Sequence, residues 1–289
     1  MSQVIEIIAV VFDFDDTLAP DSTTKLLKAF NFDTDEFWGV KAKSLISQGY
    51  DPPLAYLKLI LENIGEDKPF GLLTNKDLFD FGASLDGDFC EGLPDFFDDL
   101  RNEARARFKN IDIEYYIISG GLQPLLEGSA IVQKYFRAVY GCQLAGDTED
   151  GPLKYIKRCI TFTEKTRYPF EINKGVDVSQ SRSNPYLVNE AKEVESRRIP
   201  FPNIIYVGDG VTDIPCFSLL KHFKGMGFGV FDPKNKDKAK AALEKFLQPH
   251  RVITMTSPRY GPDSELGVFL RQAVANRCGA IALESKTAL

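Results

Sequence analysis

Residues Val4–Leu18 read VIEIIAVVFDFDDTL, an apolar run that leads directly into three aspartates. Val4–Phe12 is rich in β-branched residues, which is typical of a buried central strand in a parallel sheet. Strand alternation would place Asp13 and Asp15 on the same side, where two carboxylates repel each other unless a cation lies between them. A turn needs at most one such aspartate as a cap. The stretch therefore predicts either a cation site at the edge of a sheet or an acidic turn.

Four more apolar runs predict strands, and helical patterns lie between them. The predicted strands are Ile113–Ser119, Asn203–Val207, Met226–Val230 and Arg251–Met255. The predicted helices are Leu93–Phe108, Asn189–Ser196, Asp213–Phe223 and Asn235–Leu247. Alternating strands and helices predict an α/β fold with a Rossmann-like parallel sheet and helices on both faces. Ligands bind such sheets beyond the carboxyl ends of the strands.

About 100 residues separate the first two predicted strands, too many for a crossover helix. Four segments inside this stretch have helical spacing of apolar residues: Ser22–Phe30, Asp33–Ile46, Pro52–Ile64 and Asn75–Phe81. We therefore predict a small α-helical cap domain over residues 20–88, inserted into a core domain made of residues 1–19 and 89–289. The polar stretch Val176–Pro202 is expected to be an exposed loop.

The chain of 289 residues has 35 basic and 41 acidic residues, a net charge of −6, which argues against binding to nucleic acid or anionic lipid. The first apolar run, Ile7–Phe12, is far shorter than the ~20 residues of a membrane span, and no basic residue precedes it as in a signal peptide. We therefore expect a cytoplasmic protein with a small polar ligand. The chain has two histidines, His222 and His250, and its five cysteines form no C-x-x-C pair, so catalysis is expected to use carboxylates.

Two other predicted strands also end in polar residues. Gly208–Asp213 reads GDGVTD, and Ser119–Gly121 reads SGG. Each alone is equally compatible with an ordinary turn, with Asp213 as a helix N-cap. Together they share a chemistry with Asp13 and Asp15, because carboxylate oxygens suit Mg²⁺ while a hydroxyl and backbone N–H groups suit a phosphate.

These three strand ends resemble the motifs of the haloacid dehalogenase (HAD) superfamily of aspartate-nucleophile phosphohydrolases. The first motif, Asp-x-Asp-x-Thr, matches Asp13–Thr17, and the second, a Ser or Thr that closes a strand, matches Ser119. The fourth motif, Gly-Asp-x-x-x-Asp, matches Gly208–Asp213. The resemblance covers about residues 5–231 and implies a HAD-like fold. The long insertion looks like the cap of the phosphoserine-phosphatase-like branch.

The third motif of this family is a lysine near the start of a helix. Lys165 opens a plausible helix, and Lys174 lies nine residues further on. The loop after Gly175 suggests that Lys174 closes this helix, where a cation faces the negative end of the macrodipole. We therefore favour Lys165 and keep Lys174 as the alternative.

The resemblance implies a Mg²⁺-dependent phosphatase in which Asp13 forms an aspartyl-phosphate with a small phosphorylated metabolite. It implies that Asp15 protonates the leaving group and then activates water, and that Thr17 orients Asp15 by a hydrogen bond. The expected phosphate ligands are Ser119, Gly120 and Lys165, and the expected metal ligands are Asp13, Asp15 through its backbone carbonyl, Asp209 and Asp213. An acid at position 15 favours a phosphatase over a dehalogenase.

Three alternatives share parts of this site. A response-regulator receiver uses similar groups, but it is shorter, has no cap and carries its acceptor aspartate on a later strand than the acidic pair. A non-catalytic relative would keep the fold without the activity. A phosphotransferase would use every residue named above and pass the phosphoryl group to an alcohol instead of water.

Overall fold

A computed structural model describes residues 6–233, 240, 243–247 and 249–287 of the chain. In this part of the chain the strands form one seven-stranded sheet in the order β4-β3-β2-β1-β5-β6-β7. Their bounds are β1 (Glu6–Phe12), β2 (Ile111–Leu122), β3 (Phe136–Ala145), β4 (Tyr155–Arg158), β5 (Ile204–Gly208), β6 (Met226–Val230) and β7 (Met255–Thr256). All neighbouring strands run parallel except β3 and β4.

The register of the three central strands aligns their carboxyl ends. Phe12 at the end of β1 pairs with Ile117 of β2 and with Val207 of β5. Asp13, the residue after β1, is therefore level with Ile118 and Gly208, each of which is followed directly by a polar residue, Ser119 or Asp209. The sheet itself thus brings Asp13, Ser119 and Asp209 to one edge.

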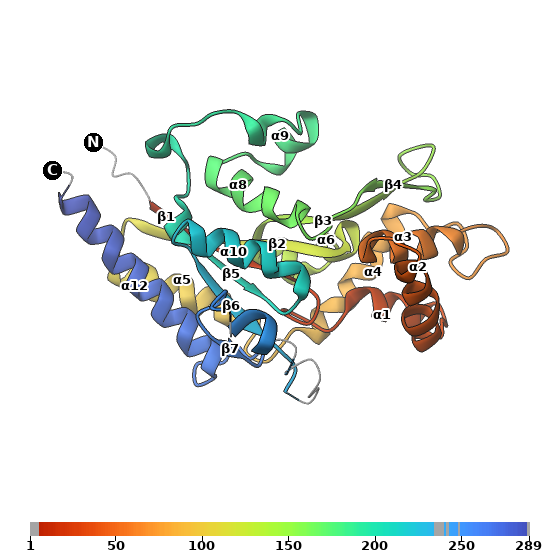
Figure 1. The fold of residues 1–289 in the computed structure, drawn as a ribbon, viewed down its shortest axis with the longest axis horizontal. Helices are drawn as coiled ribbons and strands as arrows, with labels where there is room; N and C mark the ends of the chain where they lie inside the picture. The colour runs from red at the N-terminus through yellow and green to blue at the C-terminus, as the bar shows by residue number, and fades with distance from the viewer. Residues whose placement is uncertain (1–5, 234–239, 241–242, 248, 288–289) are drawn as a thin grey trace.

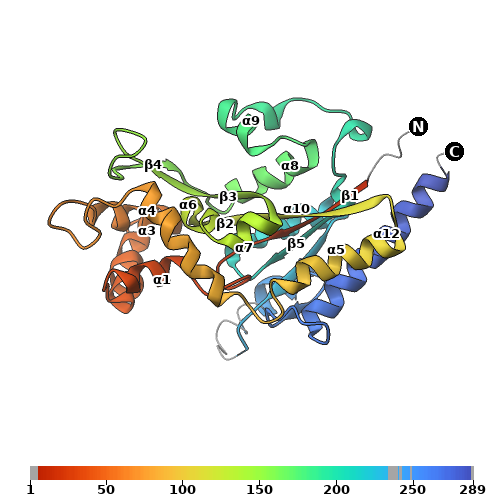
Figure 2. The ribbon, with the colours of Figure 1, turned by 180° about the vertical axis from the view of Figure 1, so that it is seen from behind.

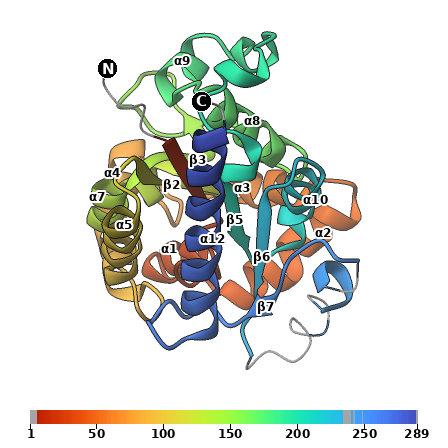
Figure 3. The same cartoon turned by 90° about the vertical axis from the view of Figure 1, so that its left-hand side faces the viewer.

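Helices cover both faces of the sheet (Figures 1 and 2). Helices α8 (Arg167–Lys174) and α10 (Ile214–His222) lie on the face toward the viewer in Figure 1, and α5 (Asp95–Arg107) and α7 (Ala130–Tyr135) on the opposite face in Figure 2. Figure 3 shows the sheet between α5 and α10. The other helices of this core are α6 (Gln123–Glu127), α9 (Val178–Ser183) and α12 (Glu265–Thr287). The predicted α/β fold with a covered parallel sheet is confirmed.

The long segment between β1 and β2 is helical, and we call residues 20–88 the helical insert. It contains α1 (Ser22–Ala29), a π-helical segment (Glu36–Ala42), α2 (Lys43–Ser47), α3 (Pro52–Glu62) and α4 (Asn75–Gly82). Its aromatic side chains pack on one another, with ring centroids of Phe32 and Phe70 4.6 Å apart. The insert also packs directly on α6, where a β-carbon on Gly128 would lie 1.8 Å from the carbonyl oxygen of Phe79.

Several sequence predictions differ from the structure. The stretch Val176–Pro202, expected to be an exposed loop, is mostly exposed but contains the short helix α9, and Ser181 and Ile199 in it are buried because they pack against the core. The predicted helix Asn189–Ser196 is wrong: the segment has only short 3₁₀ turns at Leu187–Asn189 and Val194–Ser196, because its residues are mostly exposed and have no core to pack against. The predicted strand Arg251–Met255 is displaced, since β7 covers Met255–Thr256. The predicted helix Asn235–Leu247 lies largely outside the described residues, which include a π-helical turn over Leu243–Leu247.

The sequence analysis did not assign β3, α6, α7, α9 or α12. Helix α12 has 23 residues and contacts α5, and Arg271 on it lies over the ring of Phe96 at 5.1 Å from the centroid. Among the helices that the structure describes, none combines the length and the apolar character needed to span a membrane.

Candidate active site

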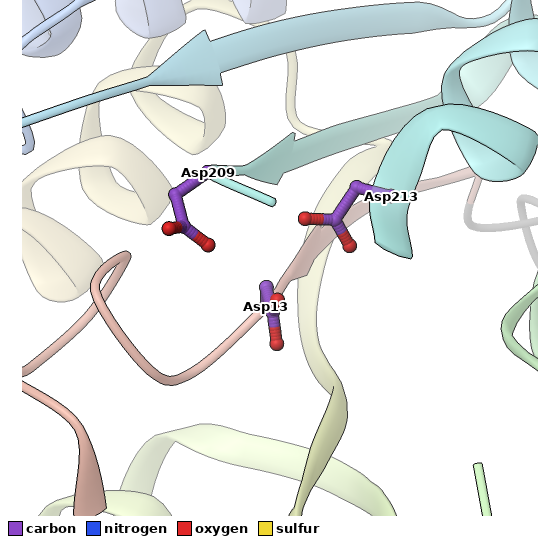
Figure 4. A group of neighbouring side chains, drawn as sticks. All are labelled: Asp13, Asp209 and Asp213. Carbon is purple, nitrogen blue, oxygen red and sulfur yellow. The ribbon is translucent and has the colours of Figure 1, made fainter. Parts of the chain in front are cut away.

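Three aspartates converge at the carboxyl edge of the sheet (Figure 4). Asp13 follows β1, Asp209 follows β5, and Asp213 directly precedes α10. Their side chains point toward a common space, and one carboxylate oxygen of each lies within 4.8 Å of the others. Asp13 is 6% exposed and Asp213 is 0% exposed, whereas Asp209 is partly exposed.

Lys165 is the cation that contacts two of these carboxylates. Its Nζ donates to Asp13 Oδ2 at 2.8 Å and to Asp213 Oδ1 at 2.7 Å, and the residue is 1% exposed. One ammonium group does not balance three carboxylates. Burial raises the pKa of Asp13 above its ordinary value, an effect that the attraction of Lys165 only partly offsets. Burial also raises the pKa of Asp209, and Asp13 and Asp213 raise it further.

Asp213 is held in place by three protein donors. Its Oδ1 accepts hydrogen bonds from Lys165 Nζ and from the hydroxyl of Tyr206 at 2.8 Å, and its Oδ2 accepts one from the backbone N–H of Gly210 at 3.0 Å. A β-carbon on Gly208 would lie 2.5 Å from Asp213 Oδ2, so the glycine makes room for this carboxylate. Tyr206 was missed by the sequence analysis, although a tyrosine two residues before Gly208 on a buried strand was a usable signal.

The side chain of Asp15 does not join the group of three, contrary to the expectation from strand alternation. β1 ends at Phe12 and the chain then turns: Leu18 N–H donates to Phe14 O at 2.8 Å, and Asp16 has a φ of 55°. Asp15 Oδ1 instead accepts a hydrogen bond of 2.7 Å from the backbone N–H of Ser22, at the start of α1. Burial raises the pKa of Asp15 well above its usual range, and nearby Asp21 raises it further.

The predicted hydrogen bond from Thr17 to Asp15 is not formed. The Thr17 hydroxyl oxygen is buried and has no hydrogen-bond partner among the described residues. The turn after β1 explains this, because the Thr17 backbone N–H donates to Phe14 O and the Asp15 carboxylate faces α1. The backbone carbonyl of Thr17 accepts a hydrogen bond of 2.9 Å from the hydroxyl of Tyr260, and the role of Thr17 stays a prediction.

Ser119 lies beside Asp15, on the other side of the site from Asp209. β2 continues to Leu122 with an irregular register after Ile118, so Ser119 and Gly120 lie inside the strand and not after it. Ser119 is fully buried, and its Oγ accepts a hydrogen bond of 2.9 Å from the backbone N–H of Gly121. A β-carbon on Gly121 would lie 2.9 Å from Asp15 Oδ2 and 3.2 Å from Ser119 Oγ.

The alternative lysine lies elsewhere. Lys174 is the last residue of α8, and Gly175 follows it with a φ of 76°. Lys174 Nζ donates to the backbone carbonyls of Val188 at 2.6 Å and Glu190 at 2.7 Å, which fastens the loop after α8. Of the two lysines, the structure therefore brings Lys165 to the three aspartates, and its role there remains a prediction.

Comparisons with known proteins place this geometry in a known fold. No family model matches the chain. An uncharacterized protein from Borreliella burgdorferi is 30% identical over 244 residues, which cover 77% of this chain and 81% of that protein. A HAD family hydrolase from Salmonella enterica superposes with a TM-score of 0.51 at 13% identity, over 88% of this chain and 68% of that one. A probable phosphoserine phosphatase from Vibrio cholerae superposes with a TM-score of 0.53 at 12% identity, over 96% and 69%.

The structural likenesses confirm the fold that the motifs predicted: it is the HAD-like fold shared by the two solved structures. The chain belongs to one family with the Borreliella burgdorferi protein.

Proposed function

We propose that the protein is a Mg²⁺-dependent phosphatase that hydrolyses a small phosphate monoester through an aspartyl-phosphate on Asp13. The observation that carries this proposal is the position of Asp13, whose carboxylate contacts Lys165 and faces Asp209 and Asp213 at the edge of the sheet. The HAD-like fold supports it, because in open α/β sheets this edge is where ligands bind.

Each residue of the site has a task in this reaction. Asp13 attacks the phosphorus atom and the ester oxygen leaves, which splits one difficult displacement into two easier ones. The ammonium group of Lys165 attracts the phosphoryl oxygens and keeps the Asp13 carboxylate oriented. The hydroxyl of Ser119 donates a hydrogen bond to a phosphoryl oxygen, and the backbone N–H groups near Gly120 form the rest of the anion site.

Asp15 lies where a proton donor to the leaving group is needed. Its carboxyl group is separate from the three aspartates, lies near Ser119, and has a pKa raised by burial. A raised pKa favours the protonated form of the carboxyl group, which donates its proton to the leaving oxygen, and the carboxylate then accepts a proton from the attacking water. Thr17 supports the turn that carries Asp15, because the backbone N–H of Thr17 donates to Phe14 O.

The donor set at the three aspartates fits Mg²⁺. Three carboxylates with one lysine leave excess negative charge, and hard oxygen ligands are what this ion prefers. Asp13, Asp209 and the backbone carbonyl of Asp15 would hold the ion, with Asp213 directly or through water. When bound, Mg²⁺ supplies positive charge that stabilises the phosphoryl oxygens during transfer.

The helical insert acts in this proposal as a cap over the site. Its first helix begins at Ser22, whose backbone N–H contacts Asp15, and its α3 carries Tyr56, whose hydroxyl contacts Gly120. The insert therefore touches both the proton donor and the phosphate site. A cap in this place excludes water from the leaving group during the attack by Asp13.

Chelation of divalent metal is expected to stop turnover, and added Mg²⁺ is expected to restore it, because the excess negative charge at Asp13 otherwise repels a phosphate. The measurement is hydrolysis of p-nitrophenyl phosphate, followed by release of both nitrophenol and inorganic phosphate. Full activity in excess chelator would contradict the metal site. Nitrophenol released without an equal amount of phosphate, in the presence of an alcohol, would identify a phosphotransferase.

Replacing Asp15 with asparagine is expected to lower kcat by roughly 10²- to 10⁴-fold, the range for one general acid–base group. The loss should be smaller for p-nitrophenyl phosphate than for an alkyl phosphate, because nitrophenolate leaves without a proton. Comparing kcat for the two esters in the wild type and in Asp15→Asn tests this. An equal loss for both esters, or a loss below tenfold for the alkyl ester, would mean that another group supplies the proton.

A further inference from the structure

The carbonyl oxygen of Gly120 receives two hydrogen bonds from outside its own strand pairing. The hydroxyl of Tyr56, on α3 of the helical insert, donates at 2.6 Å, and the thiol of Cys142, on β3, donates at 3.2 Å. Gly120 lies between Ser119 and Gly121, in the segment that we assign to the phosphate. The insert and the sheet thus both hold the same peptide group.

This peptide group controls the hydroxyl of Ser119. In a trans peptide the C=O and the following N–H point in opposite directions, so holding the Gly120 carbonyl also directs the N–H of Gly121. That N–H donates to Ser119 Oγ at 2.9 Å. Ser119 Oγ therefore accepts one hydrogen bond, and no protein acceptor for its proton is found among the described residues. The proton of Ser119 is left for a ligand.

Tyr56 is fixed in the insert and is not a mobile surface side chain. It is 7% exposed, and its ring lies 5.9 Å from the ring of Trp38, whose Nε1 donates to Thr24 Oγ1 at 2.8 Å. Tyr56 therefore connects the position of the insert to the position of the Gly120–Gly121 peptide.

We propose that Tyr56 is a positioning residue for the phosphate site: its hydroxyl orients the Gly120–Gly121 peptide so that the hydroxyl of Ser119 donates to the phosphate. The inference rests on the proposed function for the identity of the ligand. It assigns to the cap a task in phosphate binding besides the exclusion of water. The hydroxyl of Tyr56 contacts the carbonyl of Gly120 and the thiol of Cys142, and no contact with Asp13 is found among the described residues, so we assign its effect to the backbone of Gly120.

Replacing Tyr56 with phenylalanine keeps the ring and removes the donor. The dissociation constant of inorganic phosphate, measured by calorimetry with Mg²⁺ present, is expected to rise by about tenfold, the effect of one hydrogen bond of ~1.4 kcal/mol. Tyr115→Phe is the matched control, because Tyr115 is buried and donates at 2.7 Å to the carbonyl of Phe97, away from the site. This control should bind phosphate as the wild type does.

A double-mutant cycle with Ser119→Ala separates positioning from a general loss of structure. If Tyr56 acts through Ser119, then Tyr56→Phe should have little further effect in the Ser119→Ala background. Equal losses in both backgrounds would overturn the proposal, and so would unchanged phosphate binding in Tyr56→Phe. Should Tyr56→Phe fail to fold, Cys142→Ala removes the second and weaker donor to Gly120, and it should weaken phosphate binding by a smaller factor in the same Ser119-dependent way.

The two proposals fail separately in this design. A wild type that binds phosphate in a Tyr56-dependent way but hydrolyses no ester would refute the phosphatase and support the positioning role. A wild type that hydrolyses esters while Tyr56→Phe binds phosphate normally would refute the positioning role alone. A wild type that binds no phosphate would also refute the positioning role of Tyr56.

Discussion

Replacing Asp13 with asparagine is expected to abolish turnover of phosphate monoesters while the protein stays folded. The amide is no nucleophile, and loss of a covalent catalyst that works as part of a unit lowers kcat by on the order of 10⁵-fold or more. The fold should tolerate the change. Asp13 Oδ1 accepts a hydrogen bond of 2.8 Å from the backbone N–H of Phe14, and the amide oxygen of asparagine can accept the same bond. Removing one of three clustered carboxylates also lowers their mutual repulsion.

The measurement combines turnover of p-nitrophenyl phosphate with thermal unfolding of the same preparation. Slow deamidation of the new asparagine would restore Asp13, so mass spectrometry of the assayed sample is the control. Acid quenching of the wild type during turnover, followed by peptide mass spectrometry, should locate a phosphoryl group on Asp13. A folded variant that keeps most of its activity, with no deamidation, would end the proposed mechanism.

Much of the fold was predictable because its signals are local. The apolar run that ends at Phe12 identifies a buried strand, and the strands predicted at Ile113–Ser119 and Asn203–Val207 pair with it on either side. Parallel pairing brings their carboxyl ends together without further information. The convergence of Asp13, Ser119 and Asp209 at one edge of the sheet is a direct result of that topology.

Details of side-chain direction were not predictable in the same way. Strand alternation was applied to Asp13 and Asp15, but regular strand geometry stops at Phe12. The turn that follows depends on backbone hydrogen bonds to Phe14 and on a left-handed conformation at Asp16, and neither leaves a mark in the hydrophobic pattern. The expected bond from Thr17 to Asp15 failed for the same reason.

Residues that reach the site from distant parts of the chain were also missed. Tyr56 contacts Gly120, 64 positions away in the sequence, and Tyr206 contacts Asp213 from inside a strand. Neither belongs to a motif, and a tyrosine in an apolar segment is most often part of a core. Only the packing of the insert against the sheet makes Tyr56 a candidate for a role in the site.

Replacing Lys165 with alanine is expected to lower kcat/KM by roughly 10²- to 10³-fold, the usual loss for one donor that stabilises developing charge. The same change should destabilise the metal-free protein by about 3–5 kcal/mol, since it removes the one cation that, among the described residues, contacts both Asp13 and Asp213. Burial by itself lowers the pKa of Lys165, but the two carboxylates outweigh burial and hold it above its ordinary value. Lys165 therefore stays charged, and its loss leaves two buried carboxylates that keep neutral hydrogen-bond donors but lose the cation that contacts them both.

Lys174→Ala is the matched control, because Lys174 ends α8, the helix that follows the 3₁₀ turn of Lys165, and among the described residues its Nζ contacts the backbone carbonyls of Val188 and Glu190. It should keep wild-type kcat/KM. Chemical unfolding of both variants with and without Mg²⁺ separates stability from catalysis. Added Mg²⁺ should recover part of the stability of Lys165→Ala, because either cation offsets the charge of Asp13. It should not recover the activity of this variant. A larger loss of activity in Lys174→Ala than in Lys165→Ala would move the third motif to Lys174. Equal stability of Lys165→Ala and the wild type without metal would show that the three aspartates do not carry the negative charge on which the proposed metal site depends.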